Sequence, residues 1–147
     1  GDSVILGIRN KLAMQTEIAL INARVGRQIS DLIKAVEEDK SKVGSSSVVL
    51  NVGNNNSVSR DDMVKLMELL KDQPKVVVVN TSVPRTWREG NNKIISEVVA
   101  GYPNAVLVDW ASTAENHPEF FAPDGVHLIE SGSDVYIASI LDALNSK

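Results

Sequence analysis

The sequence contains no cysteine, which excludes disulfides, zinc–thiolate sites and thiol nucleophiles. It also lacks a basic cluster: 15 Lys and Arg against 19 Asp and Glu give a net charge of −4, so we expect no nucleic-acid partner. The longest aliphatic runs, such as Val76 to Val79, fall far short of the roughly 20 apolar residues that span a bilayer, and no signal-peptide pattern is found. Any targeting or anchoring segment is therefore expected outside these residues.

The sequence does contain enough apolar material for a core. Hydrophobic residues make up 43% of the 147 residues and charged residues 23%, an ordinary balance for a globular protein. A chain of this length buries roughly two-thirds of its surface on folding, so it needs no covalent staples. We therefore expect residues 1–147 to form a single domain and to be monomeric.

Short β-type runs alternate with helical patterns along the chain. Three of the runs are dense in Val, Ile and Leu without strict alternation, as in strands buried on both faces of a parallel sheet. Between them, apolar residues recur at helical spacing, as at Ile29, Leu32, Ile33 and Val36. This alternation predicts an α/β fold in which helices cover both faces of a parallel sheet. The predicted strands are residues 17–22, 47–52, 75–80 and 105–109.

Functional residues of such a sheet are expected just beyond the carboxyl ends of its strands. Pro123-Asp124-Gly125-Val126-His127 follows the last predicted strand after a longer stretch, and Gly1-Asp2-Ser3 precedes an opening helix. A serine nucleophile needs an imidazole beside its hydroxyl and a carboxylate to orient that imidazole. Because Asp124 and His127 lie three apart on one predicted turn, the carboxylate can accept the Nδ1–H bond and leave Nε2 free for the serine proton. Ser3, Asp124 and His127 are therefore the predicted catalytic triad.

Each of these residues also has a plainer interpretation. Serine is a common helix N-cap, so Ser3 alone would indicate only a cap. His117 is the other histidine available as a base, but it lies in a polar stretch, and we expect a loop residue there. Asp109 ends a predicted strand and rivals Asp124 for orienting the imidazole, although the proximity of Asp124 to His127 in sequence favours Asp124. The two histidines lack an evident third ligand, so we expect no metal, and the chemistry needs no cofactor.

Negative charge that develops on a substrate oxygen requires hydrogen-bond donors. Ser3, at a helix start, offers its backbone N–H together with the helix dipole. Gly26 follows the first predicted strand and can bring a backbone N–H close to a substrate, because it has no Cβ. Asn55 follows the second predicted strand and can donate through its side-chain amide, with Asn54 as the alternative if the register shifts by one. Ser3, Gly26 and Asn55 are therefore candidate donors, although ordinary turns would also explain the glycine and the asparagine.

These positions together resemble the sequence blocks of the SGNH (GDSL-type) hydrolase superfamily over nearly the whole chain. The matching positions are Gly1-Asp2-Ser3, Gly26, Gly53-x-Asn55 and Asp124-x-x-His127. The resemblance implies a three-layer α/β/α sandwich with a flavodoxin-like parallel sheet. It implies the triad given above and an oxyanion hole formed by the Ser3 N–H, the Gly26 N–H and the Asn55 side chain. It also implies a strand directly before Gly-Asp-Ser, which we expect to lie ahead of Gly1 and to be missing from these residues. One departure is Asn56, where many esterases of the superfamily have aspartate.

A longer set of residues carries a more specific resemblance. These residues are Gly1-Asp2-Ser3-Val4, Ala23-Arg24-Val25-Gly26-Arg27-Gln28, Val83-Pro84-Arg85-x-Trp87, Leu107-Val108-Asp109-Trp110 and His117-Pro118-Glu119-x-Phe121-x-Pro123-Asp124-Gly125-Val126-His127. They are similar to the extracytoplasmic catalytic domain of Gram-positive peptidoglycan O-acetyltransferases. The resemblance implies acetyl transfer to the C6 hydroxyl of N-acetylmuramic acid, with the peptidoglycan glycan strand as acceptor. It further implies that a separate membrane acyltransferase domain, absent here, supplies the acetyl donor.

The same resemblance sets expectations for place and substrate contacts. The domain is expected at the extracellular face of the cell membrane, as a soluble domain of a membrane-anchored protein. Arg27, Arg85 and Trp87 are candidate substrate contacts, because aromatic faces and bidentate donors suit glycans, although solvated arginines and a packed tryptophan would explain them equally.

Other functions remain open on the residues alone. A carbohydrate acetylesterase or deacetylase would use the same triad, because transferase and esterase differ in how they exclude water. A non-catalytic glycan-binding module would keep the fold without the chemistry. A flavodoxin-like or receiver-like domain shares the topology but needs a phosphate loop or an acidic cluster at the strand ends, and the sequence has neither. The Gly-x-Ser-x-Gly elbow of α/β-hydrolases would need glycine where Ile5 stands.

Overall fold

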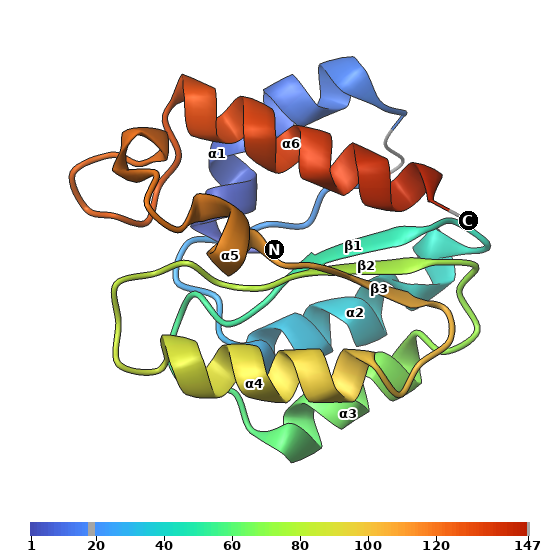
Figure 1. Cartoon of the computed structure of the whole chain (residues 1–147). Helices are drawn as coiled ribbons and strands as arrows, with labels where there is room; N and C mark the ends of the chain where they lie inside the picture. The colour runs from blue at the N-terminus through green and yellow to red at the C-terminus, as the bar shows by residue number, and fades with distance from the viewer. Residues whose placement is uncertain (18–19, 147) are drawn as a thin grey trace.

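The computed structural model describes residues 1–17 and 20–146, which form three layers, with a parallel sheet between two layers of helices (Figure 1). Among the described residues, the sheet has three parallel strands in the order β1-β2-β3. In the register of the sheet, Val48 pairs with Val76, and Val76 pairs with Ala105. The strands are β1 (Val48–Asn51), β2 (Val76–Val79) and β3 (Ala105–Val108). The α/β/α class predicted from the alternating pattern is therefore confirmed.

Helices cover both faces of this sheet. Helices α1, α5 and α6 lie over one face, and α2, α3 and α4 lie over the other (Figure 1). A short 3₁₀ turn, η1 (Pro118–Phe120), connects α5 to the segment before α6. The helices are α1 (Ser3–Gln15), α2 (Ile29–Val43), α3 (Arg60–Leu69), α4 (Arg88–Val99), α5 (Trp110–Ala114) and α6 (Glu130–Asn145).

The central strand β2 separates two hydrophobic cores. All four of its valines are 0% exposed, which explains why this run shows no polar alternation. Val76 and Val78 face the core under α2, α3 and α4, whereas Val77 and Val79 face the core under α1, α5 and α6. Because successive strand side chains point to opposite faces, one short run anchors both helical layers.

The prediction of a strand at residues 17–22 is wrong for the residues that the structure describes. The described residues 17 and 20–22 lie in no strand, and residues 18 and 19 lie outside the described part of the chain. A strand is stabilised by pairing, and the outer edge of β1 instead borders a cavity of about 620 Å³. The carbonyl of Asn22 accepts hydrogen bonds from the Gly1 amino group (2.7 Å) and from Arg27 Nη1 (3.1 Å), outside any strand ladder.

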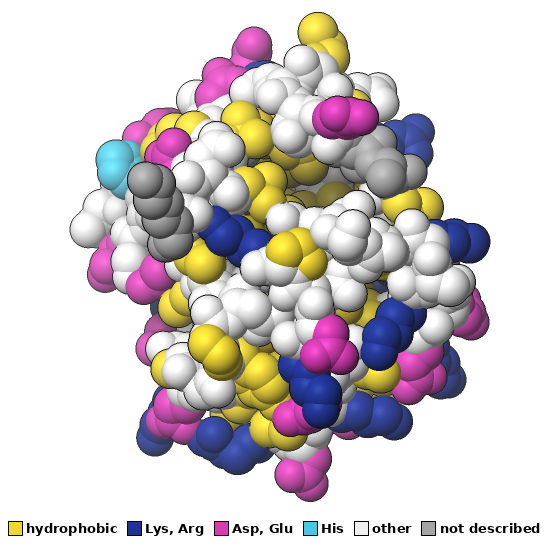
Figure 2. Space-filling view, turned by 90° about the vertical axis from the view of Figure 1, so that its right-hand side faces the viewer, with side chains coloured by type: hydrophobic (Ala, Val, Ile, Leu, Met, Phe, Trp, Pro, Cys, Tyr) yellow, Lys and Arg dark blue, Asp and Glu magenta, His cyan; other side chains and the backbone are white. Residues whose placement is uncertain are grey.

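This cavity beside β1 is mainly apolar. Figure 2 shows a hollow with hydrophobic side chains on its floor. Residues from both helical layers line it, among them Ile5, Leu12, Leu32, Val36 and Ile140. In a parallel pair, alternate residues bond to the partner strand, so every second residue of β1 directs its backbone groups toward the cavity. The cavity thus lies along the outer edge of β1, between the two helical layers.

Two helical glycines give opposite predictions for stability. At Gly132, in α6, an added Cβ would overlap the carbonyl oxygen of Phe120, whereas at Gly7, in α1, it would meet nothing within 4 Å. We expect Gly132→Ala to lower the free energy of unfolding by about 1–3 kcal/mol through overpacking. Gly7→Ala, which gains the same helix propensity without a clash, should raise it by about 0.5–1 kcal/mol. Urea unfolding of both variants measures this, and equal shifts would contradict the close packing of α6 on η1.

Candidate active site

Ser3 lies at the amino end of α1 and Asp2 caps that helix. The Val4 N–H donates to Asp2 Oδ1 at 2.9 Å, so the carboxylate occupies the N-cap position. Ser3 is the first helical residue, and its N–H is one of the first-turn donors that have no partner within a helix. The side chain of Ser3 is therefore presented beside an array of backbone donors.

Asp124 and His127 are fixed on one turn, as their spacing predicts. Asp124 Oδ1 accepts from the N–H groups of Val126 (2.8 Å) and His127 (3.0 Å), which folds the chain back on itself. Gly125 makes this turn possible with a φ of +70°. Asp124 Oδ2 lies 2.6 Å from His127 Nδ1. The His127 side chain and these two backbone N–H groups lower the pKa of Asp124 to about 2, so the carboxylate is ionised at neutral pH.

The structure brings Ser3 and His127 together from opposite ends of the chain. His127 Nε2 lies 3.0 Å from Ser3 Oγ. With Asp124 accepting from Nδ1–H, the neutral imidazole has its lone pair on Nε2, directed at the serine hydroxyl. The side chains of His127 and Asp124 are 47% and 46% exposed, so a substrate can reach them from solvent. The arrangement is a hydrogen-bonded Ser-His-Asp chain that can accept the serine proton.

The rival residues from the sequence lie elsewhere. Asp109 caps α5, because its carboxylate accepts from the Ser112 N–H and hydroxyl and from Asn80 Nδ2. His117 pairs with Glu119 at 2.7 Å and stacks on Phe120 with a centroid distance of 4.7 Å. Both side chains are therefore engaged in local structure.

Gly125 gives a prediction for the geometry of the site. An added Cβ would combine the strain of a positive φ with a contact of 3.0 Å to Pro84 Cγ. We expect Gly125→Ala to displace the turn and to lower kcat roughly 10- to 100-fold, because small misplacements of catalytic groups are costly. Gly44→Ala is the matched control, since Gly44 has a φ of +54° and open space around it. Steady-state rates on an acetate ester test this, and similar rates for both variants would contradict it.

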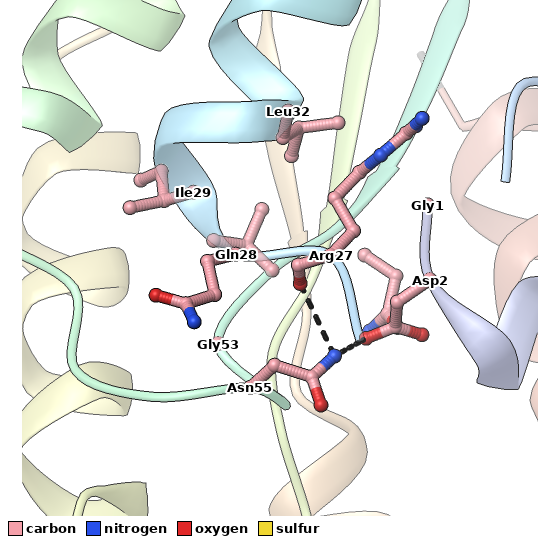
Figure 3. Close-up of a pocket in the computed structure, with 10 residues that line it drawn as sticks. Gly1, Asp2, Arg27, Gln28, Ile29, Leu32, Gly53 and Asn55 are labelled. Carbon is pink, nitrogen blue, oxygen red and sulfur yellow. Dashed lines mark hydrogen bonds between the residues drawn. The ribbon is translucent and has the colours of Figure 1, made fainter. Parts of the chain in front are cut away.

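The segments that carry the three candidate oxyanion donors are hydrogen-bonded to one another. Gly26 has a φ of +73° in a turn closed by the Arg27 N–H and the Arg24 carbonyl (3.3 Å). The Arg24 N–H donates to the Gly1 carbonyl at 3.2 Å, which holds this turn against the Gly-Asp-Ser segment. Asn55 Nδ2 donates to the Arg27 carbonyl at 3.1 Å and to Asp2 Oδ2 at 3.2 Å (Figure 3). Its amide thus connects the two segments.

Asn54, the alternative donor, is built into the interior. Its Nδ2 donates to Asp2 Oδ2 (2.9 Å) and to Asn51 Oδ1 (2.6 Å), and its Oδ1 accepts from the Thr81 hydroxyl at 2.6 Å. Asn54 is buried, whereas Asn55 is half-buried at the surface of the site. Burial raises the pKa of Asp2, and hydrogen bonds from Val4 and Asn54 oppose that rise.

The sequence analysis missed Asn91, which holds the asparagine loop. Asn91 is 2% exposed in α4; its Nδ2 donates to the carbonyls of Gly53 (3.0 Å) and Asn56 (2.9 Å), and its Oδ1 accepts from the Val58 N–H (2.8 Å). Asn91 precedes Ile95 by one helical turn, so a polar residue on the buried face of that helix was the available signal.

The candidate substrate contacts are less concentrated. The Arg27 guanidinium donates to Asn22 Oδ1 (2.8 Å) and points away from Asn55 in Figure 3. Arg85 is exposed and donates to the Pro84 carbonyl at 3.1 Å. Trp87 is half-buried, and among the residues that the structure describes its buried Nε1 has no hydrogen-bond partner. Within the described part of the chain, none of the three side chains is hydrogen-bonded to Ser3, so their substrate role stays a prediction.

Within residues 1–17 and 20–146, no three His, Cys, Asp or Glu side chains gather where they could hold a metal ion. In the same part of the chain, no helix has the length and apolar character needed to cross a membrane.

Comparison with known proteins connects this geometry to a family. No family model matches the chain. The peptidoglycan O-acetyltransferase OatA of Listeria monocytogenes is 37% identical over 146 residues, covering 99% of this chain and 23% of that protein. The C-terminal catalytic domain of OatA from Streptococcus pneumoniae, solved with a methylsulfonyl adduct, superimposes with a TM-score of 0.82 at 25% identity, covering 98% of this chain and 89% of that domain.

More distant structures share the fold. A member of the lipolytic G-D-S-L family from Veillonella parvula superimposes with a TM-score of 0.76 at 16% identity, covering 100% of this chain and 96% of that one. The chain thus has the fold of the SGNH (GDSL-type) hydrolases. It is a homologue of the peptidoglycan O-acetyltransferase OatA, and it is similar in structure to the C-terminal catalytic domain of such a protein. It spans 23% of the length of the curated relative from Listeria, about a quarter of that protein.

Proposed function

We propose that residues 1–147 act as one catalytic domain, a serine-dependent O-acetyltransferase that acetylates the C6 hydroxyl of N-acetylmuramic acid in peptidoglycan. The observation that carries this proposal is the hydrogen-bonded chain from Ser3 Oγ through His127 to Asp124, in a homologue of peptidoglycan O-acetyltransferases. The chemistry needs no cofactor, because hydroxyl, imidazole and carboxylate supply the nucleophile, the base and its support.

In the first step, Ser3 Oγ attacks the carbonyl carbon of an acetyl ester donor. His127 Nε2 takes the hydroxyl proton as the Oγ–C bond forms, and Asp124 stabilises the imidazolium. The N–H groups of Ser3 and Gly26 and the Asn55 amide stabilise the oxyanion. The bond to the donor oxygen then breaks, His127 returns the proton to that oxygen, and an acetyl-Ser3 ester remains.

In the second step, a hydroxyl group of the glycan strand replaces the donor alcohol. His127 removes its proton, the glycan oxygen attacks the acetyl carbon, and Ser3 Oγ leaves and takes the proton back. Water that attacks in place of the glycan gives acetate. Because the triad is about half exposed, hydrolysis competes with transfer unless the glycan occupies the site.

A membrane acyltransferase domain supplies the acetyl group in this proposal. Residues 1–147 act as a monomer at the extracellular face of the cell membrane, as the soluble part of a membrane-anchored protein. The identity to the Listeria O-acetyltransferase over a quarter of its length supports an arrangement with further domains.

Intact-mass spectrometry tests the covalent step. The protein is mixed with an activated acetate ester and quenched in acid, and we expect the mass of one acetyl group to be added and to localise to the peptide that contains Ser3. His127→Ala is the control that keeps the hydroxyl and removes the base. A folded protein that gains no acetyl group from the ester would overturn the proposal.

A carbohydrate acetylesterase is the second candidate, and the exposure of the triad to water favours it. The discriminating assay supplies an acetate ester with and without muramic-acid-containing oligosaccharides and measures both acetate and acetylated glycan. Acetylated glycan that depends on Ser3 establishes the transferase. Acetate alone, at a rate that the glycan does not change, establishes the esterase.

A further inference from the structure

The oxyanion role of Asn55 depends on which way its side-chain amide is turned. A side-chain amide has a donor end and an acceptor end of nearly equal size, and only the donor end can stabilise an oxyanion. A rotation by 180° would present the acceptor Oδ1 where the substrate oxygen becomes negative. The site therefore needs a structural reason for Nδ2 to face it.

Two neighbouring groups give that reason, because both are acceptors only. Asn55 Nδ2 lies 3.2 Å from Asp2 Oδ2 and 3.1 Å from the Arg27 carbonyl oxygen (Figure 3). With the amide reversed, Oδ1 would face a carboxylate and a carbonyl, and three acceptors would repel one another. Arg27 contributes through its backbone, which every residue has, so Asp2 is the side chain that distinguishes the two orientations.

Asp2 is itself rigidly held. It is 3% exposed, and its two carboxylate oxygens are bonded to different elements. Oδ1 accepts the Val4 N–H of α1 at 2.9 Å, and Oδ2 accepts Asn54 Nδ2 at 2.9 Å in addition to Asn55. Asn54 is in turn fixed by Asn51 and Thr81. Because the Asp2 carboxylate is held by the start of α1 and by the buried Asn54, it can hold the Asn55 amide in one orientation.

We propose that Asp2 is a positioning residue for the reaction: its Oδ2 accepts one Asn55 Nδ2–H and so fixes which end of the amide is the donor end, while the second N–H leaves the Arg27 carbonyl and is donated to the oxyanion. Asp2 thus acts on catalysis through Asn55. This inference rests on the proposed function of Ser3 and Asn55, and it assigns Asp2 a role beyond capping α1. Among the described residues Asp2 is not hydrogen-bonded to His127, although their charges interact through space, and it takes no proton in the reaction.

A double-mutant cycle separates this role from capping. Asp2→Asn keeps an oxygen for the Val4 N–H but puts an amide donor in front of Asn55, which favours the reversed amide. We expect it to lower kcat on an activated acetate ester roughly 10- to 100-fold with KM little changed, approaching the loss from removal of one oxyanion donor. Asn55→Ala should lower kcat by about 10²–10³-fold. In the Asn55→Ala background, Asp2→Asn should have almost no further effect.

The control and a second variant keep the test decisive. Asp109→Asn makes the same change at the cap of α5, where the carboxylate also accepts an asparagine amide, so its kcat should stay well above that of Asp2→Asn. If Asp2→Asn does not fold, Asp2→Ser retains a helix cap and removes the acceptor for Asn55. Equal losses from the Asp2 substitution in the wild-type and Asn55→Ala backgrounds would overturn the proposal, because the effect would then bypass Asn55.

An NMR measurement decides the inference independently of turnover. In ¹⁵N-labelled protein, the Asn55 side-chain NH₂ signals, assigned by their loss in Asn55→Ala, should move in Asp2→Asn while most backbone signals stay in place. Unchanged Asn55 NH₂ signals in a folded Asp2→Asn protein would overturn the positioning role. If the wild-type protein does not turn over the ester, the proposed function fails, and the NMR result alone still establishes or rejects the orientation of Asn55 by Asp2.

Discussion

Replacing Ser3 by alanine is expected to lower kcat/KM on acetate esters by at least ~10³-fold, because the variant has no oxygen to form the acetyl intermediate. Ser3 Oγ lies 3.0 Å from His127 Nε2, and the side chain of Asp2 caps the helix. The fold should therefore persist, and circular dichroism and thermal unfolding should match the wild-type protein. The rate is measured with an activated acetate ester, and the acetyl adduct is sought by intact mass.

A second serine provides the control for this prediction. Ser139 bonds the Val135 carbonyl at 2.9 Å within α6, so Ser139→Ala removes a hydroxyl of the same size away from the site. It should retain the wild-type rate. If Ser3→Ala kept a rate within a few fold of the wild-type protein, Ser3 would be a helix-start residue only, and the proposed function would have to be abandoned.

Replacing Asp124 by asparagine is expected to lower kcat by about 10⁴-fold, as a tautomer change does in serine hydrolases. The backbone N–H groups of Val126 and His127 need an acceptor, so the asparagine Oδ1 should stay on them. Its NH₂ group then faces His127 Nδ1, which has to become an acceptor. The ring proton moves to Nε2 and points at Ser3 Oγ, so the imidazole can no longer take the serine proton.

Rates and imidazole NMR together measure this prediction. The ¹⁵N chemical shifts of His127 should show that the protonated ring nitrogen changes from Nδ1 to Nε2, while the circular dichroism spectrum stays unchanged. Asp109→Asn is the matched control, because Asp109 caps α5 with a similar set of bonds and does not contact His127. If both variants lost activity equally, or if Asp124→Asn remained active, the orienting role of Asp124 would be wrong.

The fold was predictable where short apolar runs alternate with helical patterns. The runs at 47–52, 75–80 and 105–109 became β1, β2 and β3, because valine-rich segments flanked by helical patterns have few alternatives. Helix α5 was not predicted, since its five residues start from a capping aspartate, Asp109, and carry too short an apolar pattern. The run at 17–22 shows the limit of composition: apolar residues favour a strand, but pairing with a neighbour decides whether one forms.

The site was predictable where chemistry depends on local spacing. Asp124 and His127 are three residues apart, and one turn suffices to bring their side chains together. Asn91 and the contact of Asp2 with Asn55 were not predictable, because each joins segments that meet only after the sheet is assembled. Buried amide networks have no periodic signature in a sequence. The Arg27 guanidinium is the opposite case. Its charge made it a candidate substrate contact in the sequence, but in the structure it is hydrogen-bonded to Asn22.

The position of the nucleophile on a helix, and not on the sheet, has a consequence for how the protein loses activity. Helix α1 carries Ser3 and packs through one face, with the buried side chains of Val4, Ile5, Ile8 and Leu12. A helix held through one face opens locally at a lower free energy than the central strand β2, which is paired on both sides and fully buried. When α1 detaches, the nucleophile leaves its base while the sheet stays intact. Denaturant should therefore inactivate the domain before it unfolds it, and the midpoint for activity should precede the midpoint for loss of the sheet.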